Sequence, residues 1–325
     1  MATTTQPNSL ADRLVQNVER VIVGKTDAVR LLTTALIARG HALIEDVPGV
    51  GKTMLARSLA RSAGCQFQRI QFTPDLLPSD ITGASIYNQK TSDFEFRAGP
   101  IFSQILLADE VNRATPKTQS ALLEAMEEQQ VTVEGRTNKL PRPFMVLATQ
   151  NPVEYEGTFP LPEAQLDRFF LRVEVGYPSP EDEIAIMERQ MTAEPLEELE
   201  PVATPEDVVA MQDAARQIFV HDYVKQYIVA LVNSTRERDE AALGASPRAS
   251  LALMRGGQAL ALMDGREYVT PDDVKTMAVP VMAHRIILSP SARMRGMTGD
   301  TFVREILDDI PVPGADSRSV LSRQG

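Results

Sequence analysis

The sequence has few of the residues that build disulfide-linked or metal-bound scaffolds. Its 325 residues include one cysteine, Cys65, which excludes an internal disulfide and favours a reducing compartment. The three histidines, His41, His221 and His284, are far apart and lack the spacing of a zinc site. No apolar run approaches the length of a membrane span, and the N-terminus has no signal-peptide pattern. We therefore expect a cytoplasmic protein without a membrane span.

An excess of basic residues is also missing. The chain has 33 basic and 44 acidic residues, which give a net charge of −11. Such a chain repels a polyanion on average, so avid non-specific binding to nucleic acid is disfavoured, although a local basic loop is compatible with it. The apolar fraction of 43% is that of a globular protein, and the length predicts about two domains.

The rest of the chain is organised around one stretch, EDVPGVGKT at residues 45–53. It lies between a short apolar run and a helical pattern, which is the order of a phosphate-binding loop. In such a loop, backbone N–H groups and the helix dipole attract an anion, Lys52 contacts the β- and γ-phosphates, and Thr53 binds Mg²⁺. The usual pattern begins with glycine, where this chain has Asp46. A solvated turn is the alternative, which the strand–loop–helix context disfavours.

Apolar runs that alternate with helical patterns predict the first domain. Five runs could form strands, namely residues 41–44, 67–72, 105–108, 144–148 and 170–175. They predict a doubly wound α/β domain with a parallel five-stranded sheet and helices on both faces. Two hairpins, near residues 84–98 and 131–140, interrupt the alternation.

The remaining residues predict a second, all-helical domain. Its four predicted helices are residues 206–219, 222–240, 247–263 and 271–285. Hydroxyl and proline residues begin two of them, at Thr204-Pro205 and Thr270-Pro271. The predicted boundaries are a disordered lead-in at residues 1–9, the α/β domain at 10–195, the helical domain at 202–300 and a tail at 301–325.

Polar side chains follow two of the central apolar runs. Asp109 and Glu110 come directly after residues 105–108, and Asn151 follows residues 144–148 and two polar residues. In open α/β sheets, ligands bind at the carboxyl ends of strands. Asp109 is therefore placed to hold Mg²⁺ through water, Glu110 to orient the attacking water, and Asn151 to contact that water or the γ-phosphate. The alternatives are a solvated loop for the acidic pair and an Asn-Pro turn for Asn151.

Together these residues resemble the AAA+ ATPases and, more narrowly, the MoxR family. The resemblance covers about residues 10–290 and is most specific in the first domain, where the family also has aspartate at position 46. It rests on the runs LIEDVPGVGKT (43–53), GPIF (99–102), LADEVNRA (107–114), KTQSALLEAME (117–127), ATQNP (148–152) and LDRF (166–169).

The resemblance implies a P-loop AAA+ domain, a helical lid domain and a hexameric ring with ATP between neighbouring subunits. It implies that Arg168 is the arginine finger that reaches a neighbour's γ-phosphate and that Asn151 is the sensor 1 residue. Arg248, in SPRA at residues 246–249, matches the sensor 2 position. An ordinary surface arginine is the alternative for Arg248, and the sequence leaves open whose nucleotide it serves. The hairpin near residues 84–98 matches an insert that faces the ring pore.

The same resemblance, with the motifs above, gives the set of expected site residues. The nucleotide-binding residues are Val23 and Gly24, which match a turn that packs on adenine, and Asp46, Val47, Pro48, Gly49, Val50, Gly51, Lys52, Thr53, Met54 and Arg248. The Mg²⁺ ligands are Thr53 and Asp109, and the catalytic residues are Lys52, Glu110, Asn151 and Arg168.

The expected function is Mg²⁺-dependent ATP hydrolysis that remodels or activates a protein partner. For MoxR-like proteins the resemblance implies a partner with a von Willebrand factor A domain, sometimes during metal insertion. A nucleic-acid motor is the first alternative, and the acidic composition disfavours it. A nucleotide-gated scaffold without hydrolysis is the second, and Glu110 disfavours it because a scaffold needs no water-positioning carboxylate.

Overall fold

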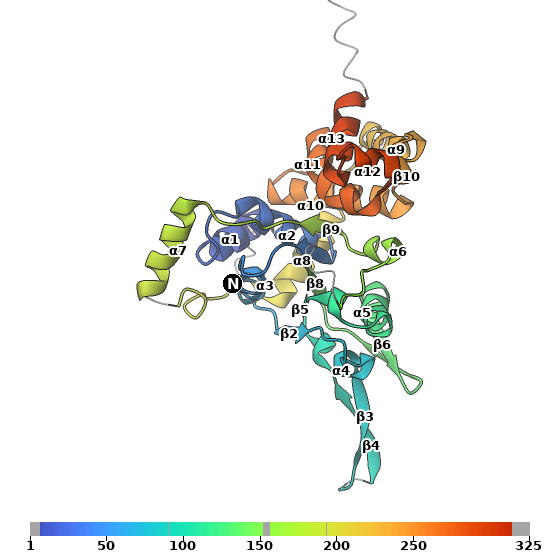
Figure 1. Ribbon diagram of the computed structural model, residues 1–325. Helices are drawn as coiled ribbons and strands as arrows, with labels where there is room; N and C mark the ends of the chain where they lie inside the picture. The colour runs from blue at the N-terminus through green and yellow to red at the C-terminus, as the bar shows by residue number, and fades with distance from the viewer. Residues whose placement is uncertain (1–6, 91, 152–156, 193, 314–325) are drawn as a thin grey trace, which may run out of the picture.

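The structure is a computed structural model, which describes residues 7–90, 92–151, 157–192 and 194–313. Its centre is a parallel five-stranded sheet (Figure 1), as predicted. The strands are β1 Ala42–Glu45, β2 Phe67–Gln71, β5 Ile105–Asp109, β8 Met145–Gln150 and β9 Leu171–Val173. Their order in the sheet is β2-β5-β8-β1-β9. Because every pairing is parallel, the carboxyl ends of all five strands lie at one edge.

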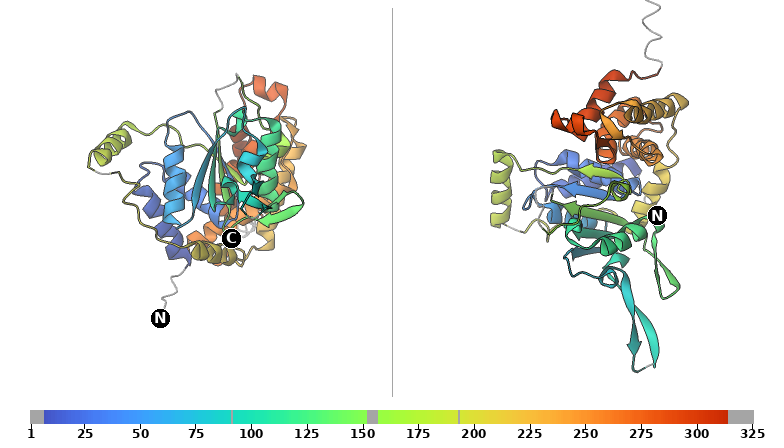
Figure 2. Two further views of the ribbon diagram at one scale, coloured as in Figure 1. Left: turned by 90° about the horizontal axis from the view of Figure 1, so that it is seen from below. Right: turned by 45° about the vertical axis from the view of Figure 1, so that its right-hand side comes forward.

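Helices cover both faces of the sheet (Figure 2). The helical elements of this domain are α1 Pro7–Glu19, α2 Thr26–Ile37, α3 Lys52–Ser62, α4 Pro78–Thr82, η1 Pro100–Phe102, η2 Val111–Arg113, α5 Pro116–Glu128, α6 Glu163–Leu166 and α7 Pro180–Thr192. Strand side chains alternate between the faces, so Ala42 and Ile44 of β1 pack with α1, α2 and α3, while Leu43 packs in the cluster of α4 and α5. The central strands β1, β5 and β8 are mostly apolar because both of their faces are buried, whereas the edge strand β2 carries the polar residues Gln68, Arg69 and Gln71.

Two antiparallel hairpins extend from this domain, as predicted. Their strands are β3 Gly83–Asn88 with β4 Asp93–Ala98, and β6 Gln130–Val133 with β7 Arg136–Lys139. The β3–β4 hairpin projects far from the sheet (Figure 1). Near its tip, Tyr87 and Phe94 contact each other edge to face, with ring centroids 5.3 Å apart, and both are exposed.

The second domain is helical, apart from one short pair of antiparallel strands that was not predicted. Its elements are α8 Pro205–Ala215, α9 Asp222–Glu237, β10 Ala241–Leu243, α10 Pro247–Met263, α11 Pro271–Met282, η3 Ala283–Arg285, β11 Ile287–Leu288, α12 Pro290–Met294 and α13 Gly299–Asp309. Capping boxes at Thr204 and Thr270 begin α8 and α11, which confirms the helix starts predicted from the sequence.

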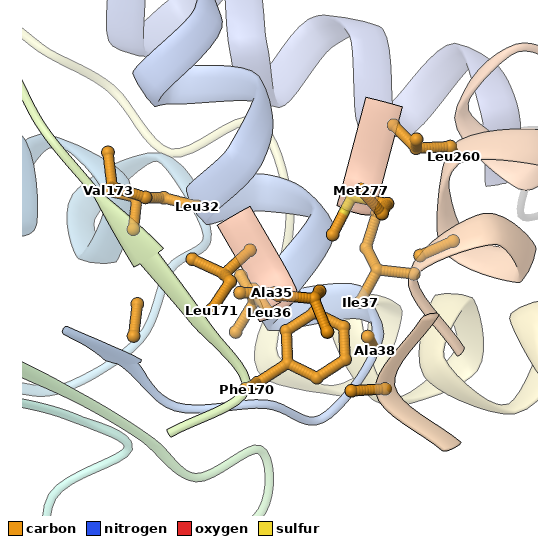
Figure 3. Packing of buried hydrophobic residues seen from close by; sticks show 14 of the residues in the cluster. Leu32, Ala35, Leu36, Ile37, Ala38, Phe170, Leu171, Val173, Leu260 and Met277 are labelled. Atoms are coloured by element: carbon orange, nitrogen blue, oxygen red, sulfur yellow. The ribbon is translucent and has the colours of Figure 1, made fainter. Parts of the chain in front are cut away.

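One apolar cluster joins the two domains. Helix α10 packs against α1 and α2, and α11 packs against β9. Leu260 and Met277 of the helical domain belong to the same apolar cluster as Leu36 and Phe170 of the α/β domain (Figure 3). A displacement of the helical domain would therefore disturb the layer that covers β9.

The described ends differ from the predicted boundaries. Helix α1 begins at Pro7, so residues 7–9 of the predicted lead-in are helical, because proline is well suited to a first helical turn. Helix α13 buries Phe302, Val303 and Ile306, so the helical domain continues past residue 300 into the predicted tail. The rest of the lead-in, residues 1–6, and of the tail, residues 314–325, lies outside the described residues. No helix in the described part of the chain is long and apolar enough to cross a bilayer.

Candidate active site

The loop between β1 and α3 has the shape of an anion cradle. Gly49 and Gly51 have φ angles of 87° and 88°, and a Cβ atom on either would meet nothing within 4 Å. Gly51 is the N-cap of α3, and no side chain caps this helix end. The N–H groups of the first turn, which includes Thr53 and Met54, and the helix dipole are therefore available to an anion. This geometry fits the phosphates of a nucleotide.

Asp46 anchors this loop to the segment that follows β9. Its Oδ1 accepts a hydrogen bond from the Val47 N–H (2.8 Å), and its Oδ2 accepts from the N–H groups of Val175 (2.8 Å) and Gly176 (2.5 Å). Lys52 Nζ donates to the carbonyl oxygens of Asp46 (2.7 Å) and Val47 (3.3 Å). A carboxylate thus replaces the usual glycine because it fixes the loop through backbone donors.

The predicted adenine turn, Val23 and Gly24, lies beside the same segment. Gly24 has a φ of 69°, and a Cβ atom there would lie 2.0 Å from Asp182 Oδ2, so the position requires glycine. Lys25 Nζ donates to the carbonyl oxygen of Tyr177 (2.8 Å). The segment after β9 therefore contacts both the phosphate-binding loop and this turn.

Asp109 ends β5 and is 8% exposed. Thr149 Oγ1 donates to its Oδ1 (2.5 Å), and the Arg69 guanidinium donates to its Oδ2 (3.0 Å from Nε and 2.6 Å from Nη2). The Asp109 carboxylate and the Thr53 hydroxyl are hard oxygen donors of the kind that Mg²⁺ takes together with phosphate oxygens and water. The donor set fits Mg²⁺, with Arg69 as a competing cation.

Glu110 follows with a left-handed backbone, φ 55° and ψ 50°. Such a conformation costs a non-glycine residue about 1 kcal/mol, and here it turns the chain sharply after β5. The Glu110 N–H donates to Thr149 Oγ1 (2.8 Å), so Thr149 contacts both acidic residues. The Glu110 Oε2 accepts from Gln71 Nε2 (2.8 Å) and pairs with Arg113 Nε (3.0 Å). The Glu110 carboxylate is therefore held by two side chains of its own subunit.

Asn151 comes directly after β8 and is buried. Strand β8 lies between β5 and β1, the strands that lead to Asp109 and to the loop of Lys52. The structure thus brings Lys52, Thr53, Asp109, Glu110 and Asn151 to one edge of the sheet, where their strands end.

Arg168 and Arg248 lie at the opposite edge. Arg168 precedes β9, and its Nη2 is 3.2 Å from Glu127 Oε2, while Arg248 donates to Oε1 of the same carboxylate. They line a cavity of about 320 Å³ together with Gly40 and His41, which precede β1. The length of β1 separates this cavity from the phosphate-binding loop of the same chain, so the structure does not bring either arginine to Lys52.

The cavity at this edge is strongly basic. The arginines that line it are Arg39, Arg168, Arg248, Arg255 and Arg285, and the acids are Glu127 and Asp167. Burial lowers the pKa of Arg285 to about 10, with Asp167 opposing the shift, so this guanidinium is still charged at neutral pH. The net positive charge suits a polyanionic group.

Several side chains that orient the site were not identified from the sequence. They are Arg69, Gln71, Arg113, Glu127 and Thr149. Gln71 is the last residue of β2 and Thr149 the second-last residue of β8, so polarity at the strand ends was a usable signal for these two. Glu127 ends the run KTQSALLEAME, but nothing local pairs it with Arg248, which is 121 residues away.

Comparisons with known proteins assign both domains to families. Residues 41–171 match the model of the ATPase family associated with various cellular activities (AAA), and residues 233–306 match that of an AAA lid domain. The crystal structure of a candidate ATPase from Cytophaga hutchinsonii superposes with a TM-score of 0.88 and 39% sequence identity, over 94% of this chain and 96% of that one. The fold and the P-loop geometry thus define an AAA+ ATPase, and the second domain is its lid.

Curated relatives narrow the class. Chaperone MoxR1 of Mycobacterium tuberculosis is 42% identical over 93% of this chain and 82% of its own length. Protein MoxR of Methylorubrum extorquens is 30% identical over 96% and 98%, respectively, and the uncharacterised protein YeaC of Bacillus subtilis is 52% identical over 96% and 98%. The chain belongs to the MoxR family of AAA+ ATPases.

Proposed function

We propose that this protein hydrolyses ATP with Mg²⁺ at sites shared between neighbouring subunits of a ring. The observation that carries the proposal is the separation of two half-sites on one chain. The phosphate-binding loop and the acidic pair lie at the carboxyl edge of the sheet, and the basic cavity lies at the amino edge. A head-to-tail contact, repeated until it closes, joins each half-site to the other half-site of a neighbour. The MoxR resemblance implies six subunits.

Each residue then has a role that follows from its position. Lys52 and the N–H groups of the loop bind the phosphates, and Thr53 and Asp109 hold Mg²⁺, which when bound neutralises phosphate charge. Glu110, fixed by its own subunit, orients the attacking water, with Asn151 beside it. Arg168 enters from the neighbour and stabilises the charge that develops on the γ-phosphate.

We assign Arg248 to the neighbour's nucleotide as well. It converges with Arg168 on Glu127, at the edge away from its own phosphate-binding loop. Glu127 then keeps the two guanidinium groups close together until a nucleotide replaces it as their anionic partner.

The test is the substitution Arg168→Ala, with Arg304→Ala as the matched control. Arg304 is an exposed arginine on α13 of the lid. We expect the Arg168 variant to bind ATP with parental affinity and to lose ATPase activity by on the order of 10³-fold, as arginine fingers do in GTPases. The control should stay close to the parental rate. Parental turnover by the Arg168 variant would contradict the proposal.

We propose further that hydrolysis drives the remodelling or activation of a protein partner. The name of the relative Chaperone MoxR1 supports a client protein, and the family resemblance points to a von Willebrand factor A domain and to metal insertion. The exposed Tyr87 and Phe94 of the β3–β4 hairpin are suitable for contact with a client. Because the chain has a single cysteine, we assign this activity to a reducing compartment such as the cytoplasm, which cell fractionation tests.

A partner can be sought with the Glu110→Gln variant, which is designed to bind ATP without hydrolysing it. Proteins with a von Willebrand factor A domain should be retained by this variant in ATP and lost in ADP. The Tyr87→Ser variant in the Glu110→Gln background should retain less of them. Equal retention in ATP and ADP would contradict nucleotide-driven remodelling.

A further inference from the structure

The residue before the finger is held by the lid of its own chain. Arg285 Nε donates to Asp167 Oδ1 (2.9 Å), and Ser246 Oγ donates to Asp167 Oδ2 (2.8 Å). Both donors belong to the lid, and only 3% of the Arg285 side chain and 18% of the Asp167 side chain are exposed. An ion pair that is largely buried between two domains is costly to build, because both charges lose water. The placement of this ion pair directly before Arg168 suggests that it acts on the finger.

Arg285 also holds the main chain that follows the finger. Its guanidinium donates to the carbonyl oxygens of Phe169 (2.5 Å) and Phe170 (3.1 Å), the two residues that follow Arg168. His284 Nε2 also lies 3.3 Å from the Phe169 carbonyl oxygen. The backbone from Asp167 to Phe170 is thus fixed by one lid element, η3.

The second lid contact ties the other arginine to the same point. Ser246 is the N-cap of α10, and its Oγ also accepts a hydrogen bond from the Arg248 N–H (3.1 Å). One hydroxyl therefore contacts Asp167 and the backbone of Arg248. Arg168 and Arg248 start from a common support and end on a common carboxylate, Glu127.

We propose that Asp167 is a positioning residue that couples the lid to the arginine finger. Through Arg285 and Ser246 it presents Arg168 and Arg248 as a fixed pair to the nucleotide of the neighbouring subunit. A movement of the lid then shifts both arginines together, so each subunit's lid controls hydrolysis in the neighbouring site. The inference rests on the shared site proposed above.

The variant Asp167→Asn removes the charge and keeps the size of the side chain. The matched control is Asp264→Asn, because Asp264 also pairs with an arginine across the two domains, Arg30 (3.0 Å), away from the finger. We expect the Asp167 variant to form rings and bind ATP normally, and to lose kcat by about 10- to 100-fold, the scale of a misplacement near 1 Å. The Asp264 variant should stay near parental activity. Parental kcat in the Asp167 variant would overturn the inference.

Mixed rings separate positioning from a general structural role. The Asp167→Asn subunit has an intact P-loop and Glu110, and the Glu110→Gln subunit has an intact finger. A complete site therefore forms wherever the finger of a Glu110→Gln subunit reaches the P-loop of an Asp167→Asn subunit. Random mixing in equal amounts should restore about a quarter of the parental rate per subunit, because one contact in four has this arrangement. The Ser246→Ala variant, which adds no uncompensated charge, should show a smaller loss and the same restoration.

A parallel mixture of Arg168→Ala with Glu110→Gln tells the two possible failures apart. If this mixture regains activity and the Asp167→Asn mixture does not, Asp167 does not act through the finger and the inference is overturned. If neither mixture regains activity, the shared site itself is wrong, and the inference fails with it. If both regain activity, the positioning role is supported.

Discussion

A buried histidine makes the stability of this protein depend on pH in a way that can be worked out from the structure. His41 lies just before β1, and only 6% of it is exposed. Its Nδ1 accepts from the Val146 N–H (2.9 Å), which leaves Nε2 to donate to the carbonyl oxygen of Met126 (3.1 Å). Burial lowers the pKa of His41 to about 4, although the Met126 carbonyl acts in the other direction. The neutral ring joins the end of α5, which carries Glu127, to the sheet.

The sign and size of the effect follow from linkage. The unfolded chain binds a proton at His41 near pH 6.5, and the folded chain does so only near pH 4, so the unfolded state holds more protons between these values. The contribution of the neutral His41 to the free energy of unfolding is fully present above pH 6.5 and is lost as the pH falls towards 4. At about 1.4 kcal/mol per pKa unit, the loss between pH 7 and pH 4 is about 3 kcal/mol.

The test compares the parent with His41→Gln by urea unfolding at several pH values. Glutamine does not titrate. Between pH 7 and pH 4, the free energy of unfolding should therefore fall by about 3 kcal/mol less in the variant than in the parent. Burial also lowers the pKa of His284, but that residue is present in both proteins and its effect cancels. A difference between the two proteins that is independent of pH would refute the reasoning.

Three further predictions concern the loop, the metal and the cysteine. Asp46→Ala leaves the backbone N–H donors of the loop without their acceptor, at a cost of about 1–3 kcal/mol each when buried. The Kd of this variant for ATP, measured by titration calorimetry, should therefore rise at least tenfold. The Kd of Asp46→Asn should lie between that of Asp46→Ala and that of the parent. Arg69→Met removes the cation that competes for Asp109, so half-maximal ATPase activity should need less Mg²⁺; an unchanged or higher requirement would show that Arg69 does not compete. Burial raises the pKa of Cys65 to about 12, so a disulfide reagent at pH 8 should modify it slowly in the native protein and quickly in urea, and equal rates would contradict its burial.

The local parts of the fold were predictable from the sequence because short-range chemistry determines them. A continuous apolar run flanked by polar residues identified β5 and β8, and hydroxyl-proline pairs identified the starts of α8 and α11. The C-terminal end of the lid was harder to predict, because α13 buries only three apolar side chains.

The candidate site was predictable in its motifs and not in its supports. The loop around Lys52 and the acidic pair after β5 have local patterns, because strand ends and helix starts create them. By contrast, Asp167 and Arg285 are 118 residues apart, and neither residue type indicates a partner. Such pairings depend on how the lid packs on β9, which no window of sequence contains.

The central claim is that one active site is made by two subunits, and the most direct test is the ATPase rate per subunit as a function of protein concentration. We predict that the rate is close to zero in dilute monomer and rises together with ring assembly, measured in the same samples by mass photometry. A rate per subunit that stays constant into the monomeric range would contradict the shared site.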